Sequence, residues 1–138
     1  MTAMKNEENE KVPEIFWRHI AERHWEDVKS LLSDDFEALW PQSREKMNRD
    51  GFVAVNQNYP GTHKIQVLKV IYEYDHWNHH SNIVTQVHVK SQMPDGKFLE
   101  FYATSFFEVV NEKIISLVEY WAETYPAPEW RKQWVERY

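Results

Sequence analysis

The 138-residue chain carries 22 acidic and 16 basic side chains, a formal net charge of −6, and no cysteine. The acidic charge, with no run of Lys or Arg to offset it, argues against a nucleic-acid partner, and the lack of cysteine excludes disulfides, thiol nucleophiles and cysteine-based metal centres. No apolar run approaches the roughly 18 residues of a membrane span, and the polar N-terminus lacks the layout of a signal peptide, so we expect a soluble, cytoplasmic protein without a membrane partner.

The chain has the size and composition of a single domain. Roughly two thirds of the surface of an unfolded chain of this length can be buried on folding, and 42% of the residues are hydrophobic, with 7 Trp, 7 Tyr and 7 Phe among them. Residues 1–11 differ, because they are polar and charged in the way typical of disorder. We therefore expect a mobile N-terminal arm over residues 1–11 and one domain over residues 12–138.

The first part of this domain has the pattern of helices. Apolar side chains recur at helical spacing over residues 12–33, and the pattern allows either one helix or two helices that meet near Arg23 and His24. Residues 36–40 then alternate as a short strand. A second helix is predicted over residues 43–58, because the Tyr-Pro-Gly sequence that follows is a strong helix stop.

The remainder has the pattern of long antiparallel strands. Residues 64–74 and 82–92 are rich in β-branched and aromatic side chains, and residues 97–123 read as two further strands joined at the polar residues 111–112. Residues 129–137 predict a short terminal helix. Helices followed by a strand meander predict an α+β fold. Strands of about eleven residues favour curling, so we expect a cone-shaped sheet with an internal cavity.

The order of these elements and several local motifs resemble the nuclear transport factor 2-like (NTF2-like) superfamily, and more narrowly an uncharacterised subgroup of its SnoaL-like branch. The motifs are HWEDV (24–28), LLSDDF (31–36), NYPG (58–61), PDGK (94–97), KII (113–115) leading to EYW (119–121), and APEWRKQWVER (127–137). The resemblance implies N-terminal helices packed on a strongly curved, mainly antiparallel sheet. It also implies an interior pocket and a homodimer formed through the outer sheet face.

The resemblance implies a type of chemistry without naming a reaction. Catalytic members of the superfamily, such as ketosteroid isomerase, limonene epoxide hydrolase, scytalone dehydratase and polyketide cyclases, use acid–base catalysis without a metal or an organic cofactor. Glu119 stands where hydrolase and cyclase members have a catalytic Asp. The epoxide hydrolase also has an Arg and an Asp where this chain has Gln86 and His88, and the Asp base of ketosteroid isomerase is missing near residues 39–41. We therefore expect neither of these two activities.

Glu119 is the main candidate for chemistry, with His88 as its candidate proton partner. Glu119 shares a strand face with Leu117 and Trp121, so a cavity-facing carboxyl group there would be desolvated and its pKa raised toward the range of a catalytic acid or base. A neutral imidazole beside it would complete an acid–base pair. The alternatives are a structural glutamate paired with a cation and a strand histidine exposed on the outer face.

Two further groups of side chains are candidates for binding. The sequence Asp75-His76-Trp77-Asn78-His79-His80 offers metal ligands, but adjacent histidines on a hairpin tip rarely converge on one ion, so we expect a solvated turn and no metal. The expected substrate-binding residues are Trp17, Trp40, Asn56, Tyr59, Gln86, Tyr102, Phe106 and Trp121. The aromatic members either line a cavity or pack in the core and a dimer interface.

These inferences lead to two functional hypotheses. In the first, a homodimer without cofactors binds a small apolar carbonyl compound and isomerises, cyclises or dehydrates it, with Glu119 and His88 as the catalytic residues. In the second, the chain is a non-catalytic NTF2-like module that binds a ligand or another protein.

Overall fold

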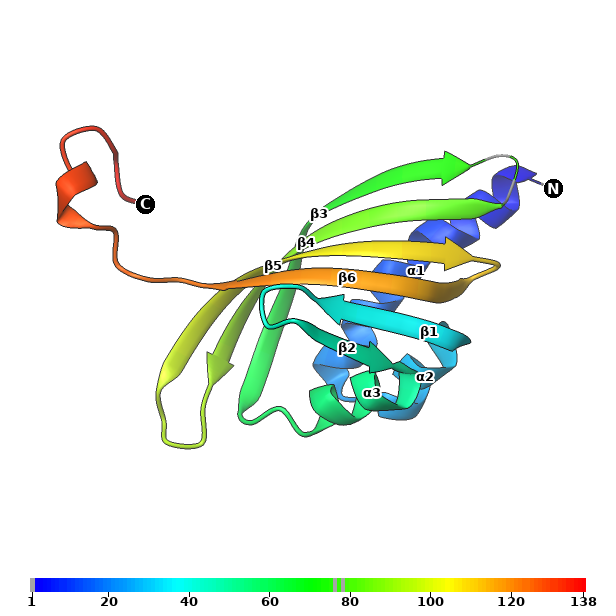
Figure 1. Cartoon of the computed structure of the whole chain (residues 1–138), viewed down its shortest axis with the longest axis horizontal. Helices are drawn as coiled ribbons and strands as arrows, with labels where there is room; N and C mark the ends of the chain where they lie inside the picture. The colour runs from blue at the N-terminus through cyan, green and yellow to red at the C-terminus, as the bar shows by residue number, and fades with distance from the viewer. Residues whose placement is uncertain (1, 76, 78) are drawn as a thin grey trace.

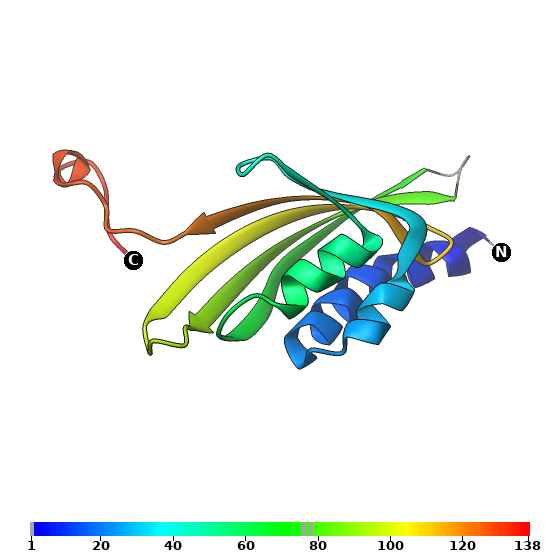
Figure 2. The same ribbon diagram turned by 60° about the horizontal axis from the view of Figure 1, so that its bottom comes forward.

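The computed structural model describes residues 2–75, 77 and 79–138, with side chains from residue 8 onward. Three α-helices cover one face of a six-stranded mixed sheet in the described part of the chain (Figures 1 and 2). The elements are α1 (Thr2–Glu22), α2 (Trp25–Leu31), β1 (Leu32–Trp40), β2 (Glu45–Asn48), α3 (Arg49–Gln57), β3 (Thr62–Asp75), β4 (His80–Gln92), β5 (Phe98–Val110), β6 (Lys113–Glu123) and the 3₁₀ turn η1 (Glu129–Arg131). None of the described helices is long and apolar enough to cross a membrane.

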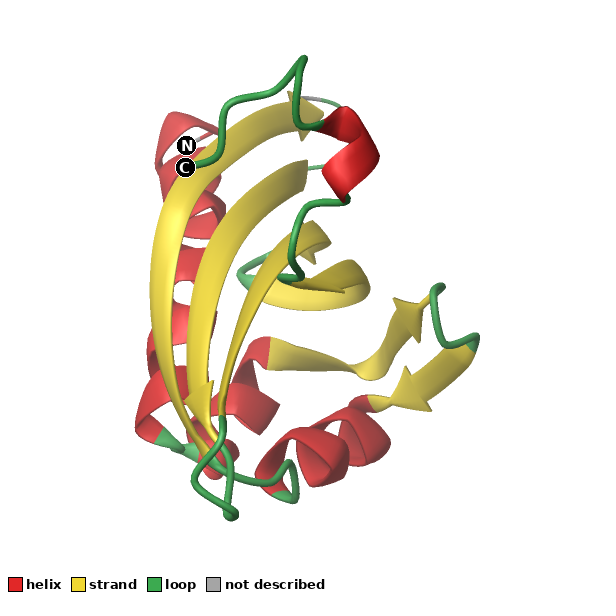
Figure 3. Cartoon of the chain, turned by 90° about the vertical axis from the view of Figure 1, so that its left-hand side faces the viewer, coloured by secondary structure: helices red, strands yellow, loops and turns green. Residues whose placement is uncertain are grey.

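The sheet confirms the predicted α+β fold with a strongly curved, mainly antiparallel sheet. Its strand order is β2-β1-β6-β5-β4-β3, and every neighbouring pair is antiparallel except β1 and β6. The predicted four-strand meander is therefore β3 to β6. The sheet bends around the helices without closing (Figure 3). Phe16 of α1 joins the layers, because its ring stacks on Phe52 of α3 at 6.0 Å and meets Phe107 of β5 edge-on at 5.3 Å.

The N-terminal helix begins earlier than predicted. Helix α1 starts at Thr2, so residues 2–11 of the predicted mobile arm form its first turns, and Met1 lies outside the described residues. Tertiary contacts explain the difference: Asn9 is buried, accepts a hydrogen bond from the Glu112 backbone N–H at 2.8 Å and donates one to Ser81 Oγ at 3.3 Å. The polar composition of this segment alone gave no sign of these partners. Of the two open readings for residues 12–33, two helices are present, and α1 ends at a turn where Arg23 has a left-handed φ of 59°.

Two other predicted helices differ from the structure. Residues 43–58 contain the short strand β2 before α3, because the chain turns back beside β1 and pairs Met47 with Ala38. Asn48 then caps α3 by accepting a hydrogen bond from the Gly51 N–H at 2.8 Å. The predicted terminal helix is only the single turn η1, with Trp130 exposed, because the tail extends away from the body of the molecule (Figure 1) and its apolar side lacks a surface to pack on.

A β-bulge decides which face of β6 points inward. Val109 pairs with Ile114, whereas the next pair is Glu108 with Ser116, so Ile115 is an extra residue on β6. Past this point the inward-facing positions shift by one, and Glu119 lies opposite buried Ser105. The bulge therefore turns Glu119 toward the helices.

Candidate functional site

A cavity of about 540 Å³ lies between the helices and the inner face of the sheet. Its wall is largely aromatic, with contributions from Phe16, Trp17, Trp25, Trp40, Phe52, Tyr59, Phe101 and Trp121. Small-molecule sites typically combine such an apolar wall with a few polar groups at fixed positions. The polar groups here include Glu119 and His63.

Glu119 is held by two hydrogen bonds in the cavity wall. Its side chain is only 1% exposed; Oε1 accepts from Trp40 Nε1 at 3.0 Å, and Oε2 accepts from Ser105 Oγ at 2.6 Å. Burial raises the pKa of Glu119 above its ordinary value, because the charged form loses its hydration, and Ser105, Trp40 and Trp121 counteract part of this rise. The carboxyl group is therefore fixed in orientation and inclined to hold its proton.

Trp121 places a further donor beside this carboxyl group. Its indole Nε1 is buried and completes no hydrogen bond of normal geometry with a described residue. Its backbone is held by Gln42, whose Oε1 accepts from the Trp121 N–H at 2.7 Å and whose Nε2 donates to the Trp121 carbonyl at 2.5 Å. This buried N–H lies beside the Glu119 carboxyl group, where its dipole favours the charged form of that group.

His63 also lines the cavity, and the sequence reasoning did not identify it. Its Nδ1 lies 2.6 Å from Ser91 Oγ, while Nε2 is buried without a hydrogen-bond partner among the described residues. Burial and the nearby positive charge of Arg23 lower the pKa of His63, with a smaller opposing contribution from the Pro60 backbone. The imidazole is therefore neutral at neutral pH. Its alternation with the inward Ile65 was the signal that could have identified it.

The other predicted residues divide between the two faces of the sheet. Trp17, Trp40, Asn56, Tyr59 and Trp121 line the cavity together with Glu119. Four predicted residues do not line the cavity, because they occupy the even-numbered, outward positions of β4 and β5: Gln86, His88, Tyr102 and Phe106. His88 Nε2 instead lies 2.9 Å from Glu100 Oε2 on that outer face. The structure therefore does not bring His88 and Glu119 together, and the strand parity is the reason.

In the histidine-rich turn between β3 and β4, the two described histidines contact different side chains. His76 and Asn78 of this predicted metal candidate lie outside the described residues. His79 Nδ1 lies 3.2 Å from the Tyr74 hydroxyl, whereas His80 Nε2 lies 3.3 Å from Glu108 Oε2. The two described histidines thus face different groups.

Solved structures of low sequence identity share this fold. An inferred ketosteroid isomerase from Kribbella flavida is 24% identical with a TM-score of 0.74, covering 96% of this chain and 91% of that one. An NTF-2 like protein of unknown function from Burkholderia xenovorans is 23% identical with a TM-score of 0.73 and 98% coverage of both chains. An LEH-like epoxide hydrolase from M. tuberculosis is 12% identical with a TM-score of 0.68, covering 85% and 84%.

No family model matches the chain, and no curated protein matches it significantly. At these identities, the similarity to solved structures establishes the architecture and leaves the reaction open. TM-scores of 0.74 and 0.73 over almost the whole chain show that this protein and the two matched structures share one arrangement of helices and strands. The chain therefore has the nuclear transport factor 2-like fold.

Proposed function

We propose that the chain binds a small, largely apolar carbonyl compound in the cavity and that Glu119 acts on it as an acid. The observation that carries this proposal is a buried carboxyl group, held by Trp40 and Ser105, in the wall of an aromatic cavity of about 540 Å³. A carboxyl group with a raised pKa can donate a hydrogen bond to a carbonyl oxygen and stabilise the negative charge that develops there.

His63 is the proposed base of the same reaction, in place of His88. In the tautomer whose Nδ1–H donates to Ser91 Oγ, the buried Nε2 is an acceptor, and after a small rotation of the ring it takes a proton from the carbon next to the ligand carbonyl. The C–H electron pair then moves into the carbonyl group to give an enol or enolate, whose oxygen accepts a hydrogen bond from Glu119. Return of the proton to a different carbon completes an isomerisation.

The binding part of the proposal can be tested with the neutral apolar fluorophore N-phenyl-1-naphthylamine. We expect saturable binding to the native chain with a rise in fluorescence, and equally tight binding to Glu119→Gln, because the amide keeps the size of the side chain. A matched control is Glu100→Gln, which alters a carboxylate on the outer sheet face. Absence of binding to the native chain would contradict a ligand cavity.

The catalytic part can be tested by exchange of ketone α-protons in D₂O, followed by NMR over a panel of cyclic and aryl ketones. We expect exchange with the native chain and Glu100→Gln, and a loss of about 10²-fold or more with Glu119→Gln and His63→Gln. An unchanged exchange rate in both cavity variants would refute the assigned roles. Binding of the fluorophore without any exchange over the panel would favour the alternative, a non-catalytic ligand-binding module.

We also propose that two copies pair through the outer sheet face. Ile71, Phe106 and Tyr120 are about half exposed there, and the rings of Phe106 and Tyr120 meet edge-on at 6.2 Å. Exposed apolar side chains gathered on one sheet face are typical of an interface. This surface supports a homodimer whether or not the cavity is catalytic.

A further inference from the structure

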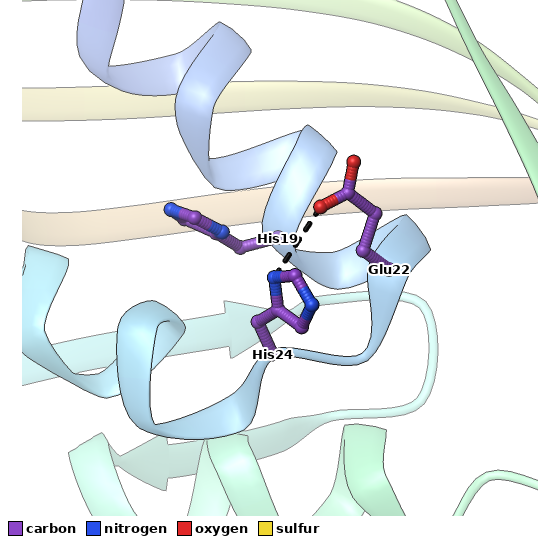
Figure 4. Close-up of side chains that lie close together, drawn as sticks. All are labelled: His19, Glu22 and His24. Atoms are coloured by element: carbon purple, nitrogen blue, oxygen red, sulfur yellow. Dashed lines mark ion pairs between the residues drawn. The ribbon is translucent and has the colours of Figure 1, made fainter.

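Two imidazoles and a carboxylate meet at the turn between α1 and α2, outside the cavity. His19 and Glu22 are on the last turn of α1, and His24 follows it (Figure 4). One ligand atom from each residue lies within 4.8 Å of the others, and no second group of three such side chains occurs among the described residues. We propose that these three side chains bind a divalent transition-metal ion of the Zn²⁺ type.

The spacing of the first two ligands fits such an ion. His24 Nδ1 lies 3.3 Å from Glu22 Oε2. Zn²⁺ binds imidazole nitrogen and carboxylate oxygen at about 2.0–2.2 Å, which places neighbouring corners of a tetrahedron about 3.3–3.6 Å apart. A small rotation of either side chain would let both atoms contact one ion. Asp27 Oδ2 lies 4.0 Å from His24 Nδ1 but does not belong to this group of three.

His19 supplies a nitrogen that is free to bind. Its Nδ1 is buried and makes no hydrogen bond with the part of the chain that is described. The centroids of the His19 and His24 rings are 5.7 Å apart, and one ligand atom of each lies within 4.8 Å of the other. A buried imidazole nitrogen without a partner is unfavourable, and coordination of a metal would satisfy it.

The backbone holds the turn in the required shape. The His24 N–H donates to the His19 carbonyl at 3.0 Å, and Arg23 adopts a left-handed φ of 59° between the ligands. The His24 carbonyl then accepts the Val28 N–H at 3.0 Å, which starts α2. The ligands therefore lie on a short, hydrogen-bonded segment, so little chain entropy is lost on binding.

Other histidine–carboxylate pairs in the protein show why this cluster differs. His80 pairs with Glu108 at 3.3 Å and His88 with Glu100 at 2.9 Å, and each pair contains a single imidazole. Such pairs are explained by an ion pair alone, and the His24–Glu22 contact by itself would be too. The second imidazole, His19, is the feature that an ion pair leaves unexplained.

An ion bound here would also stiffen the wall of the cavity. Arg23 and Trp25 flank His24 in sequence, and both line the cavity. Joining His19 to His24 through a metal ties the end of α1 to the start of α2. The site is therefore expected to reduce the opening motions of this turn, and this inference does not depend on the role proposed for Glu119.

The experiment is calorimetric titration of the full chain, without a histidine tag and stripped with EDTA, with ZnCl₂ at neutral pH. We expect one equivalent to bind the native chain, and His19→Gln and His24→Gln each to weaken binding by at least about tenfold. His80→Gln is the matched control, since it removes an imidazole paired with a carboxylate elsewhere, and it should bind as the native chain does. The ligands lie at the edge of the fold, and circular dichroism checks that each variant is folded.

Hydrogen exchange provides a second readout that also detects a folding failure. Zinc should slow amide exchange over residues 19–28 of the native chain and His80→Gln but not of His24→Gln. The visible absorption of bound Co²⁺ should show a four-coordinate ion. The proposal is overturned if the native chain binds less than one equivalent, if both cluster variants bind as tightly as the native chain, or if His80→Gln weakens binding equally.

Discussion

When a carboxylate loses its hydration on burial, its charge must be stabilised by nearby dipoles or removed by a proton. Both occur at Glu119. The N–H of Trp40 and the hydroxyl of Ser105 supply dipoles, while burial favours the protonated form. His63 is perturbed in the opposite sense, because burial and Arg23 disfavour its charge. Burial thus favours the neutral form of both an acid and a base in one cavity, a combination typical of proton-transfer sites.

The raised pKa of Glu119 predicts how stability changes with pH. An unfolded glutamate has a pKa of about 4.3, so the folded chain holds this proton more tightly than the unfolded chain. The resulting stabilisation is fully present below about pH 4.3 and is lost as pH rises through the folded pKa. Glu119→Gln does not titrate and lacks this dependence. Urea unfolding of both chains should show the native chain losing stability relative to the variant as pH rises from about 4.3.

The matched control for this pH series is Glu100→Gln. Its carboxylate lies on the outer face of the sheet, where Oε2 is 2.9 Å from His88 Nε2. We expect it not to remove the rising-pH loss. A stability difference between the native chain and Glu119→Gln that stays constant across the pH series would contradict the burial effect.

At the scale of elements, turns and bulges decide which side chains enter the cavity. The alternation of β6 correctly predicted that Glu119 shares a face with Leu117 and Trp121, but the extra residue Ile115 made that face the inner one. Ile114 and Ile115 are both apolar, so the sequence has no mark of the bulge. Strand β2 was missed for a related reason: four residues with one inward side chain, Met47, are too few to show a period of two.

The connection between α3 and β3 requires a glycine at position 61. Its φ is +91°, and a Cβ atom there would lie 2.5 Å from the Gln92 carbonyl oxygen. Gly61→Ala should therefore lower the free energy of unfolding by about 2–4 kcal/mol, from backbone strain and a clash with backbone. Gly96→Ala is the matched control, because Gly96 has a similar φ of +87° and open space around its Cβ.

Chemical denaturation of the two glycine variants separates strain from clash. We expect Gly96→Ala to cost only about 1–2 kcal/mol, the cost of a left-handed backbone for an alanine. An equal loss of unfolding free energy in the two variants would show that the clash of the residue 61 Cβ with the Gln92 carbonyl is unimportant. His63 follows Gly61 by two residues, so Gly61→Ala should also weaken binding of the apolar fluorophore.

Asn9 joins the first turns of α1 to the β3–β4 and β5–β6 hairpins, which lie far from it in the sequence. It accepts from the Glu112 N–H and donates to the Oγ of buried Ser81, so Asn9→Ala removes both hydrogen bonds and leaves the Ser81 hydroxyl without this donor. We expect a loss of about 1–3 kcal/mol in the free energy of unfolding, measured by urea denaturation. Asn58→Ala, which removes an exposed hydrogen bond to the Ala54 carbonyl, should cost less. A smaller loss for Asn9→Ala than for Asn58→Ala would show that the start of α1 is not anchored.

At the scale of the whole molecule, long strands preceded by amphipathic helices were enough to predict a curved sheet covered on one face. That prediction rests on residue periodicity, which extends over many positions and survives local errors. The site depends on single positions instead. Glu119, Trp40 and Trp121 were predicted because they are conspicuous polar or aromatic residues in their strands, whereas His63 was missed because its neighbours gave no sign of a Ser91 partner across the sheet.

The outer sheet face predicts the assembly of the whole molecule. Phe106 is 45% exposed in the middle of this face, next to Tyr120, and burying both rings against a second copy would remove apolar surface from water. Sedimentation equilibrium at micromolar concentration should therefore show a dimer for the native chain. Phe106→Glu should shift the equilibrium toward monomer by at least about tenfold, because each copy would bring an unpaired carboxylate into the interface.

The control for this prediction is Trp77→Glu, which replaces an aromatic side chain that is 93% exposed at the turn between β3 and β4, away from the middle of the face. It should leave the dimer intact. A native chain that sediments as a monomer, or a Phe106→Glu chain that dimerises as strongly as the native one, would refute pairing through this face. Because the cavity opens on the opposite side of the sheet, monomeric Phe106→Glu should still bind the apolar fluorophore, which separates assembly from ligand binding.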